Sequence, residues 1–141
     1  MRVRPWALVA LVLAASAHAQ GGRNWLEFAE GADGSMHYYD PERIQADGAF
    51  GPKAIRSWWL METKPAKAGA KSSPPDSSRY ISLYRVDCAG GQITPIQQHK
   101  FDAKGAVIAT QNGGVPSYPV PNSLGEVFVQ TSCTSAGLMG K

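Results

Sequence analysis

Two cysteines, Cys88 and Cys133, are the residues of this chain whose types offer the most definite chemistry. A pair of thiols can form a disulfide, ligate a metal ion, or supply one activated nucleophile. The sequence contains no CxxC motif, and no histidine stands beside either cysteine. The choice among these three chemistries therefore depends on the compartment in which the protein works.

The beginning of the chain predicts that compartment. A short basic start precedes an unbroken apolar run over residues 6–15, and Ala17 and Ala19 are small residues at the two positions that a signal peptidase reads. A run of ten apolar residues is too short to span a bilayer. We expect residues 1–19 to be a signal peptide cleaved before Gln20; the alternative is a buried N-terminal helix.

Export favours the disulfide among the three thiol chemistries, because exported proteins meet oxidising conditions. An even cysteine count in such a protein indicates intramolecular pairing, and two cysteines allow one pairing, Cys88 with Cys133. The bond would close a loop of about 45 residues, worth roughly 3–4 kcal/mol in the chain-entropy model. The residue directly after the predicted cleavage site is Gln20 and not a cysteine, so we expect an exported protein, periplasmic or at the cell surface, without a lipid anchor.

Other side chains give weaker chemical signals. His37 and His99 both fall on predicted strands, but two histidines without spaced carboxylates are a poor metal signal, and we expect no metal and no cofactor. Asp40 and Glu42 flank a proline and are more typical of a turn than of an acid/base pair. The sequence has no GxSxG nucleophile setting and no phosphate loop. We predict a protein that is not an enzyme; a polar pocket between helix and sheet would instead indicate a hydrolase or ligand carrier.

The chain length and the net charge limit the kinds of protein that this chain can be. Without residues 1–19 the chain has 122 residues, enough for one domain with one core. Arg2 and Arg4 leave with the signal peptide, so 12 basic side chains balance 11 acidic ones. This balance gives no electrostatic case for nucleic-acid binding. No later segment reaches transmembrane length.

Alternation of apolar and polar residues predicts a mainly antiparallel sheet. Segments with the two-residue period of a strand are separated by Gly- and Pro-rich turns, which is typical of a meander. Pro95 within one of these segments predicts an edge position or a bulge. We expect about six strands, over residues 25–30, 36–40, 54–61, 79–88, 92–101 and 107–110.

One helix is predicted near the carboxyl end. Ser123 and Glu126 form a capping-box pattern, in which the Ser hydroxyl accepts from the amide three residues on. The apolar stripe that follows is Leu124, Val127, Phe128 and Thr131. A helix of about 9–10 residues must pack on the sheet to be stable. Cys133 lies nearly opposite this stripe, so either the helix frays before it or the chain turns there.

These elements define an α+β fold: an antiparallel sheet with one short C-terminal helix packed on one face. We expect a single domain over residues 20–133 and a disordered tail over residues 134–141. The segment 64–78 is rich in Lys, Pro and Ser and predicts an exposed flexible loop, with a basic binding patch as the alternative.

Aromatic residues on the predicted strands form a candidate interaction surface. Neighbouring strand residues face opposite ways, so one member of each aromatic pair meets the helix or faces solvent. An exposed aromatic face would bind a partner or form a homodimer interface. The candidates, with the lysines of the loop, are Tyr38, Tyr39, Trp58, Trp59, Tyr80, Tyr84, Lys64, Lys67 and Lys71.

The order of these pieces resembles the surface-adhesin protein E family of Gram-negative bacteria. The resemblance covers most of the chain after the signal peptide. The pieces that carry it are Trp25, Tyr39-Asp40 followed by Ile44, Ile55-Arg-Ser-Trp58, Tyr84-Arg-Val-Asp-Cys88, Phe101-Asp-Ala-Lys-Gly105, and Val120-Pro-Asn-Ser123 before the helix that reaches Cys133.

The resemblance implies a small exported antiparallel sheet with a C-terminal helix held across it. The adhesins of that family bind host extracellular-matrix proteins at the cell surface. The expectation for this chain is therefore a non-enzymatic binding protein whose partners are host matrix or envelope-exposed proteins. The alternative is a periplasmic accessory protein of the envelope with no host-binding role.

Overall fold

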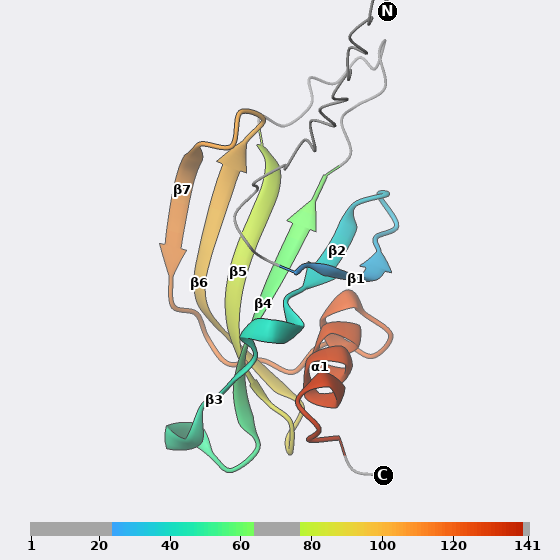
Figure 1. The fold of residues 1–141 in the computed structure, drawn as a ribbon, viewed down its shortest axis with the longest axis vertical. Coiled ribbons are helices and arrows are strands. Elements are labelled where there is room, and N and C mark those ends of the chain that lie inside the picture. Colours follow the sequence, from blue (N-terminus) through green and yellow to red (C-terminus); the bar gives the residue numbers. More distant parts are fainter. Residues whose placement is uncertain (1–23, 64–76, 140–141) are drawn as a thin grey trace, which may run out of the picture.

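A computed structural model describes residues 24–63 and 77–139, and it shows one curved antiparallel sheet with a helix against it (Figure 1). The predicted signal peptide with its cleavage site at Ala19 and Gln20, and the lysines Lys64, Lys67 and Lys71, lie outside the described residues. No helix within the described ranges has the length and apolar character needed to cross a bilayer.

The sheet follows the predicted meander, with neighbouring strands in the order β1-β2-β4-β5-β6-β7. An additional strand of two residues, β3, pairs with β4 beyond the end of β2 and was not predicted. The strands are β1 (Leu26–Glu30), β2 (Met36–Tyr39), β3 (Gln45–Ala46), β4 (Ala54–Glu62), β5 (Ser77–Asp87), β6 (Gln92–Asp102) and β7 (Val107–Asn112).

Two short 3₁₀ turns connect β2 to β4 around β3. Turn η1 spans Pro41–Arg43 and begins at Asp40, whose side chain accepts a hydrogen bond from the Glu42 amide. Turn η2 spans Gly48–Phe50 and returns the chain to β4. The Asp40–Glu42 pair therefore shapes a turn, as its position beside a proline predicts.

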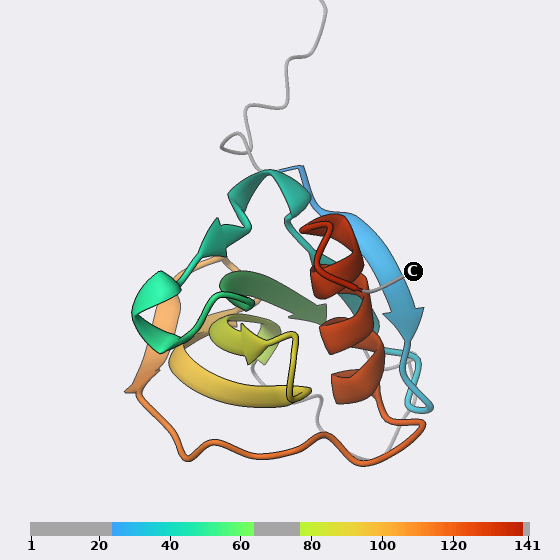
Figure 2. The same cartoon turned by 90° about the horizontal axis from the view of Figure 1, so that it is seen from below.

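The helix α1 (Leu124–Ser135) begins at the predicted cap. Ser123 Oγ accepts from the Glu126 amide at 3.4 Å, while the Glu126 carboxylate accepts from the amide of Asn122 rather than that of Ser123. In Figure 2 the helix lies along one side of the sheet near β1. The segment that follows β7 crosses the open end of the sheet to reach it.

The buried face of α1 differs from the predicted stripe. Its buried residues are Phe128, Val129, Ser132 and Cys133, whereas Leu124, Val127 and Thr131 are only half-buried. Hydrogen bonds to the sheet account for the rotation, since the Ser132 hydroxyl lies 2.8 Å from that of Ser57 and the Ser135 hydroxyl lies 2.9 Å from that of Tyr39. Small residues permit this close approach, and a count of apolar side chains alone does not reveal it.

The helix continues through Cys133 without fraying or turning there, in contrast to both predicted alternatives. It runs to Ser135, and the Leu138 amide then donates to the Cys133 carbonyl, with Gly137 in the left-handed conformation (φ 70°). Leu138 packs against the core. Ordered packing therefore extends several residues into the segment for which the sequence predicted a disordered tail.

The core lies between α1 and the concave face of the sheet. Phe128 is fully buried at its centre, with its ring stacked on Trp59 at 4.8 Å between centroids and flanked by Tyr84 and Phe28. The aliphatic part of the core consists of Ile55, Val86, Ile93 and Val129. One helix thus closes one end of the sheet through aromatic packing.

Candidate functional site

A disulfide joins Cys88 and Cys133, as the cysteine count predicts. Cys88 follows β5 at a turn where its amide donates to the Lys53 carbonyl, and Cys133 is fully buried on α1. Neither thiol is therefore free to act as a nucleophile or a metal ligand. The bond fixes the helix to the end of β5 that carries Val86.

The two histidines do not converge. The strand register places His37 in one row with Met61, Tyr80 and Lys100, so His99, the neighbour of Lys100, faces the other side of the sheet. His99 bonds to the Thr110 hydroxyl. Within residues 24–63 and 77–139, no three metal-ligating side chains come together.

His37 is instead buried within a chain of hydrogen bonds that ends at the exposed Asp33. The Trp59 indole N–H can only donate, and it donates to His37 Nδ1 at 2.9 Å. The proton of the neutral ring is then on Nε2, which donates to Ser35 Oγ at 2.9 Å, and that hydroxyl donates to Asp33 at 2.6 Å. The hydrogen bond from Ser35 lowers the pKa of Asp33, and burial lowers the pKa of His37.

This arrangement predicts a loss of stability on mild acidification. Below the ordinary histidine pKa of about 6.5, the unfolded chain takes up a proton before folded His37 does. The neutral ring therefore contributes its full stabilisation above about pH 6.5 and loses it progressively as the pH falls towards the lowered folded pKa. Urea unfolding at several pH values between 7.5 and 5 should show the unfolding free energy falling.

The matched variants are His37→Asn, which keeps an acceptor for the indole without a titrating ring, and His99→Asn on the other face. We expect the first to flatten the pH dependence and the second to keep it. An equal slope in wild type and His37→Asn would show that other groups cause it.

The candidate aromatic surface is divided between two faces of the sheet. Tyr39, Trp59 and Tyr84 point towards α1 and belong to the core or pack against it. Tyr38 and Trp58 share the opposite face, as the alternation predicts. Tyr80 is half-buried on the helix side, beyond the aromatic core, with the Lys100 ammonium 5.8 Å from its ring centroid. The six aromatics therefore do not form a single binding surface.

A charged cluster on the convex face was not predicted. Asp47 is 6% exposed and accepts hydrogen bonds from Arg85 at 2.7 Å and from Arg56 at 3.1 Å. The Arg85 bond is the main reason that the pKa of Asp47 is lowered. Arg56 and Arg85 lie 9 and 38 positions after Asp47 and are brought together by the pairing of β4 with β5 and by η2, so spacing could not reveal the cluster. Their role is to hold η2 on the sheet.

Exposed apolar side chains collect along β7 and the segment that leads to α1. We call this set the apolar strip; the sequence alone does not reveal it, because the exposure of these side chains depends on the path of the chain after β7. Every residue of β7 is exposed, and β7 lies at the end of the strand order. The members of the strip, with their exposed fractions, are Val107 (53%), Ile108 (47%), Val115 (82%), Tyr118 (70%) and Val120 (70%).

Comparison with solved structures supports the fold. Two structures of Haemophilus influenzae protein E are similar to this chain, at 13% identity with a TM-score of 0.61 and at 15% identity with a TM-score of 0.59. The first covers 83% of this chain and 89% of the other; the second covers 80% and 89%. At such identity the likeness shows a shared fold.

Comparison with protein families is more direct, although no curated protein matches the chain. The sequence model of the family described as surface-adhesin protein E matches residues 25–134, from the first strand to the end of the helix. This range includes both cysteines of the disulfide and every strand that the structure describes. The chain belongs to the surface-adhesin protein E family.

Proposed function

We propose that this protein is a non-enzymatic, exported binding protein whose partners are host extracellular-matrix proteins or other proteins exposed at the envelope. The observation that carries the proposal is the apolar strip. Soluble proteins rarely expose so many large apolar side chains on one strand and the segment after it unless a partner covers them, and the five members of the strip are 47–82% exposed. Membership of an adhesin family supports the same role.

The geometry of the strip favours contact with an extended segment of another protein. The outer edge of β7 has no strand partner among the described residues, so its backbone groups can pair with an added strand. The side chains of Val107 and Ile108 can then pack against that strand. A second copy of the chain could use the same edge, which would give a homodimer.

The predicted test is the substitution Ile108→Lys. A charge on the exposed edge strand should weaken binding at least tenfold, because the ammonium must lose water where an apolar contact stood. Surface plasmon resonance on immobilised matrix proteins measures the change. The charge-matched control is Ala103→Lys, at an exposed position in the turn between β6 and β7.

Equal weakening by both variants would show a general charge effect and would contradict a binding role for the strip. Sedimentation of wild type and Ile108→Lys distinguishes self-pairing from binding to another protein.

Protease treatment of intact cells tests location, since an envelope accessory protein inside the outer membrane is protected. Mass spectrometry of the exported protein tests cleavage before Gln20. The lysines Lys64, Lys67 and Lys71 remain a second proposed contact.

A further inference from the structure

Pro95 opens a gap in the sheet between β6 and the chain beyond β7. Proline has no N–H to donate, and the β6–β7 ladder ends with Asn112 opposite Gln97. Hydrogen bonds between β6 and the chain beyond β7 are present on both sides of the proline. The Gly113 amide donates to the Ile96 carbonyl at 2.7 Å, and Ser117 exchanges two hydrogen bonds with Ile93. The intervening residues arch past Pro95. The predicted bulge is also present, as a register shift between β5 and β6 at Leu83/Tyr84.

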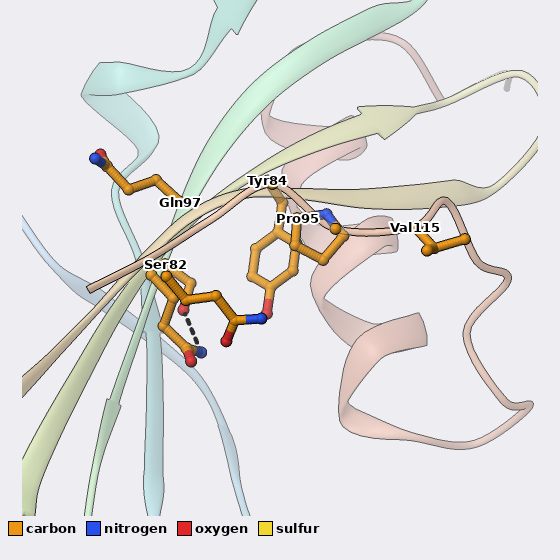
Figure 3. Close-up of a pocket in the computed structure, with 9 residues that line it drawn as sticks. Ser82, Tyr84, Pro95, Gln97 and Val115 are labelled. Carbon is orange, nitrogen blue, oxygen red and sulfur yellow. Dashed lines mark hydrogen bonds between the residues drawn. The ribbon is translucent and has the colours of Figure 1, made fainter. Parts of the chain in front are cut away.

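The arch borders an open cavity of about 300 Å³ on the helix side of the sheet (Figure 3). Gly114 forms its rim so close to the Pro95 ring that an added Cβ would lie 2.7 Å from Pro95 Cγ. Only glycine fits there without displacing the arch. The volume is at the lower limit of pockets that accept small molecules, about 300 Å³.

Uncharged polar groups converge in this cavity. Ser82, Gln98 and Gln111 contribute a hydroxyl and two carboxamides, with Gln98 Nε2 donating to Ser82 Oγ at 3.0 Å. Tyr84 adds a phenol that can donate a hydrogen bond, and burial raises its pKa. The Pro95 ring and Val115 add apolar surface.

None of the nine lining residues carries a charge. Gln97 contributes no carboxamide to the cavity, since Figure 3 shows its side chain directed away from the other labelled residues and it bonds to Asn112 at 3.3 Å. A charged ligand would therefore lose hydration without gaining an opposite charge. A ligand whose groups both donate and accept hydrogen bonds suits the carboxamides, because each carboxamide also has a donor and an acceptor.

We propose that this cavity binds a neutral, hydroxyl-rich ring, namely one sugar residue of a glycan. Ring hydroxyls pair with the carboxamides of Gln98 and Gln111 and with the phenol of Tyr84, and the apolar face of the ring packs on Pro95. The site lies on the concave face and shares Val115 with the apolar strip, but it uses neither Val107 nor Ile108, which carry the proposed protein contact on β7. If the cavity binds no sugar, the protein-binding role proposed for the apolar strip is unaffected.

The test is an NMR titration of the full exported protein with methyl glycosides of galactose, mannose and N-acetylglucosamine, and with glucuronate as a charged comparator. At least one neutral glycoside should shift the Gly113, Gly114 and Ser82 amides saturably in the millimolar range. Glucuronate should bind at least tenfold more weakly. Retention of the native melting temperature shows that each variant is folded.

The decisive variant is Gln111→Glu, which keeps the size of the side chain and replaces its donor with a charge. It should weaken binding of that glycoside at least tenfold. The matched control is Asn112→Asp, the same chemical change one residue along β7 on the opposite face. No saturable shift with any neutral glycoside, equal binding of glucuronate, or equal loss in both variants would overturn the proposal.

Discussion

Replacing Phe128 with alanine should lower the free energy of unfolding by about 3–5 kcal/mol, the usual cost of removing a buried phenylalanine ring. Phe128 has no exposed surface and lies among Trp59, Tyr84 and Phe28, with ring centroids at 4.8, 5.6 and 5.8 Å. The neighbouring rings come from three strands of one rigid sheet and cannot close over the space left behind. Urea unfolding monitored by tryptophan fluorescence measures the loss.

The matched control is Phe50→Ala, which removes the same ring from the convex side. Phe50 is 59% exposed, and its main contact is the Arg85 guanidinium above its ring. A cation–π contact at such a site is worth about 0.5–1 kcal/mol, so this variant should lose far less stability. Equal losses in the two variants would contradict the assignment of Phe128 as the centre of the core.

Local patterns predicted the elements and the pairing of the chain well, because the forces that set them act between neighbours in sequence. Ser123 marks the helix start because its hydroxyl reaches an amide three residues ahead. Pro95 marked a bulge because the lack of an N–H is a property of the residue itself. The disulfide followed from the count of cysteines and the predicted compartment.

Features that depend on the third dimension could not be predicted in this way. The helix face was placed by apolar periodicity, yet Ser132 is buried because its hydroxyl meets Ser57 across the core. The cluster on Asp47 joins residues of β4 and β5 to the residue that precedes η2, and their sequence spacing carries no signal. The cavity beside Pro95 exists only because Gly114 lies against the ring, a contact between residues 19 positions apart.

The sequence predicted only in part how the aromatic side chains divide between the two faces of the sheet. Alternation correctly separated Tyr38 from Tyr39 and Trp58 from Trp59, but it could not say which member of each pair faces the helix. That choice is made by α1, which covers only one side of the sheet. The apolar strip was missed for a related reason, since exposure of Val115 and Tyr118 depends on where the chain runs after β7.

Replacing Cys133 with serine should lower the free energy of unfolding by about 2–4 kcal/mol. The bond closes a loop with a sequence separation of 45, and its loss restores conformational freedom to the unfolded chain. The serine hydroxyl would also lie where Cys133 is fully buried, which adds to the loss. The melting temperature in oxidising buffer, compared with wild type, measures the effect.

Three comparisons isolate the contribution of the bond itself. Cys88→Ser should cost a similar amount, and the double variant should cost much less than the sum, because one crosslink is lost in all three. Thr134→Ser, an exposed change at the next helix position, should leave the melting temperature nearly unchanged. Reducing agent should lower the melting temperature of wild type and not that of Cys133→Ser. A wild-type protein that melts at the same temperature with and without reductant would show that packing of Phe128 alone holds the helix on the sheet.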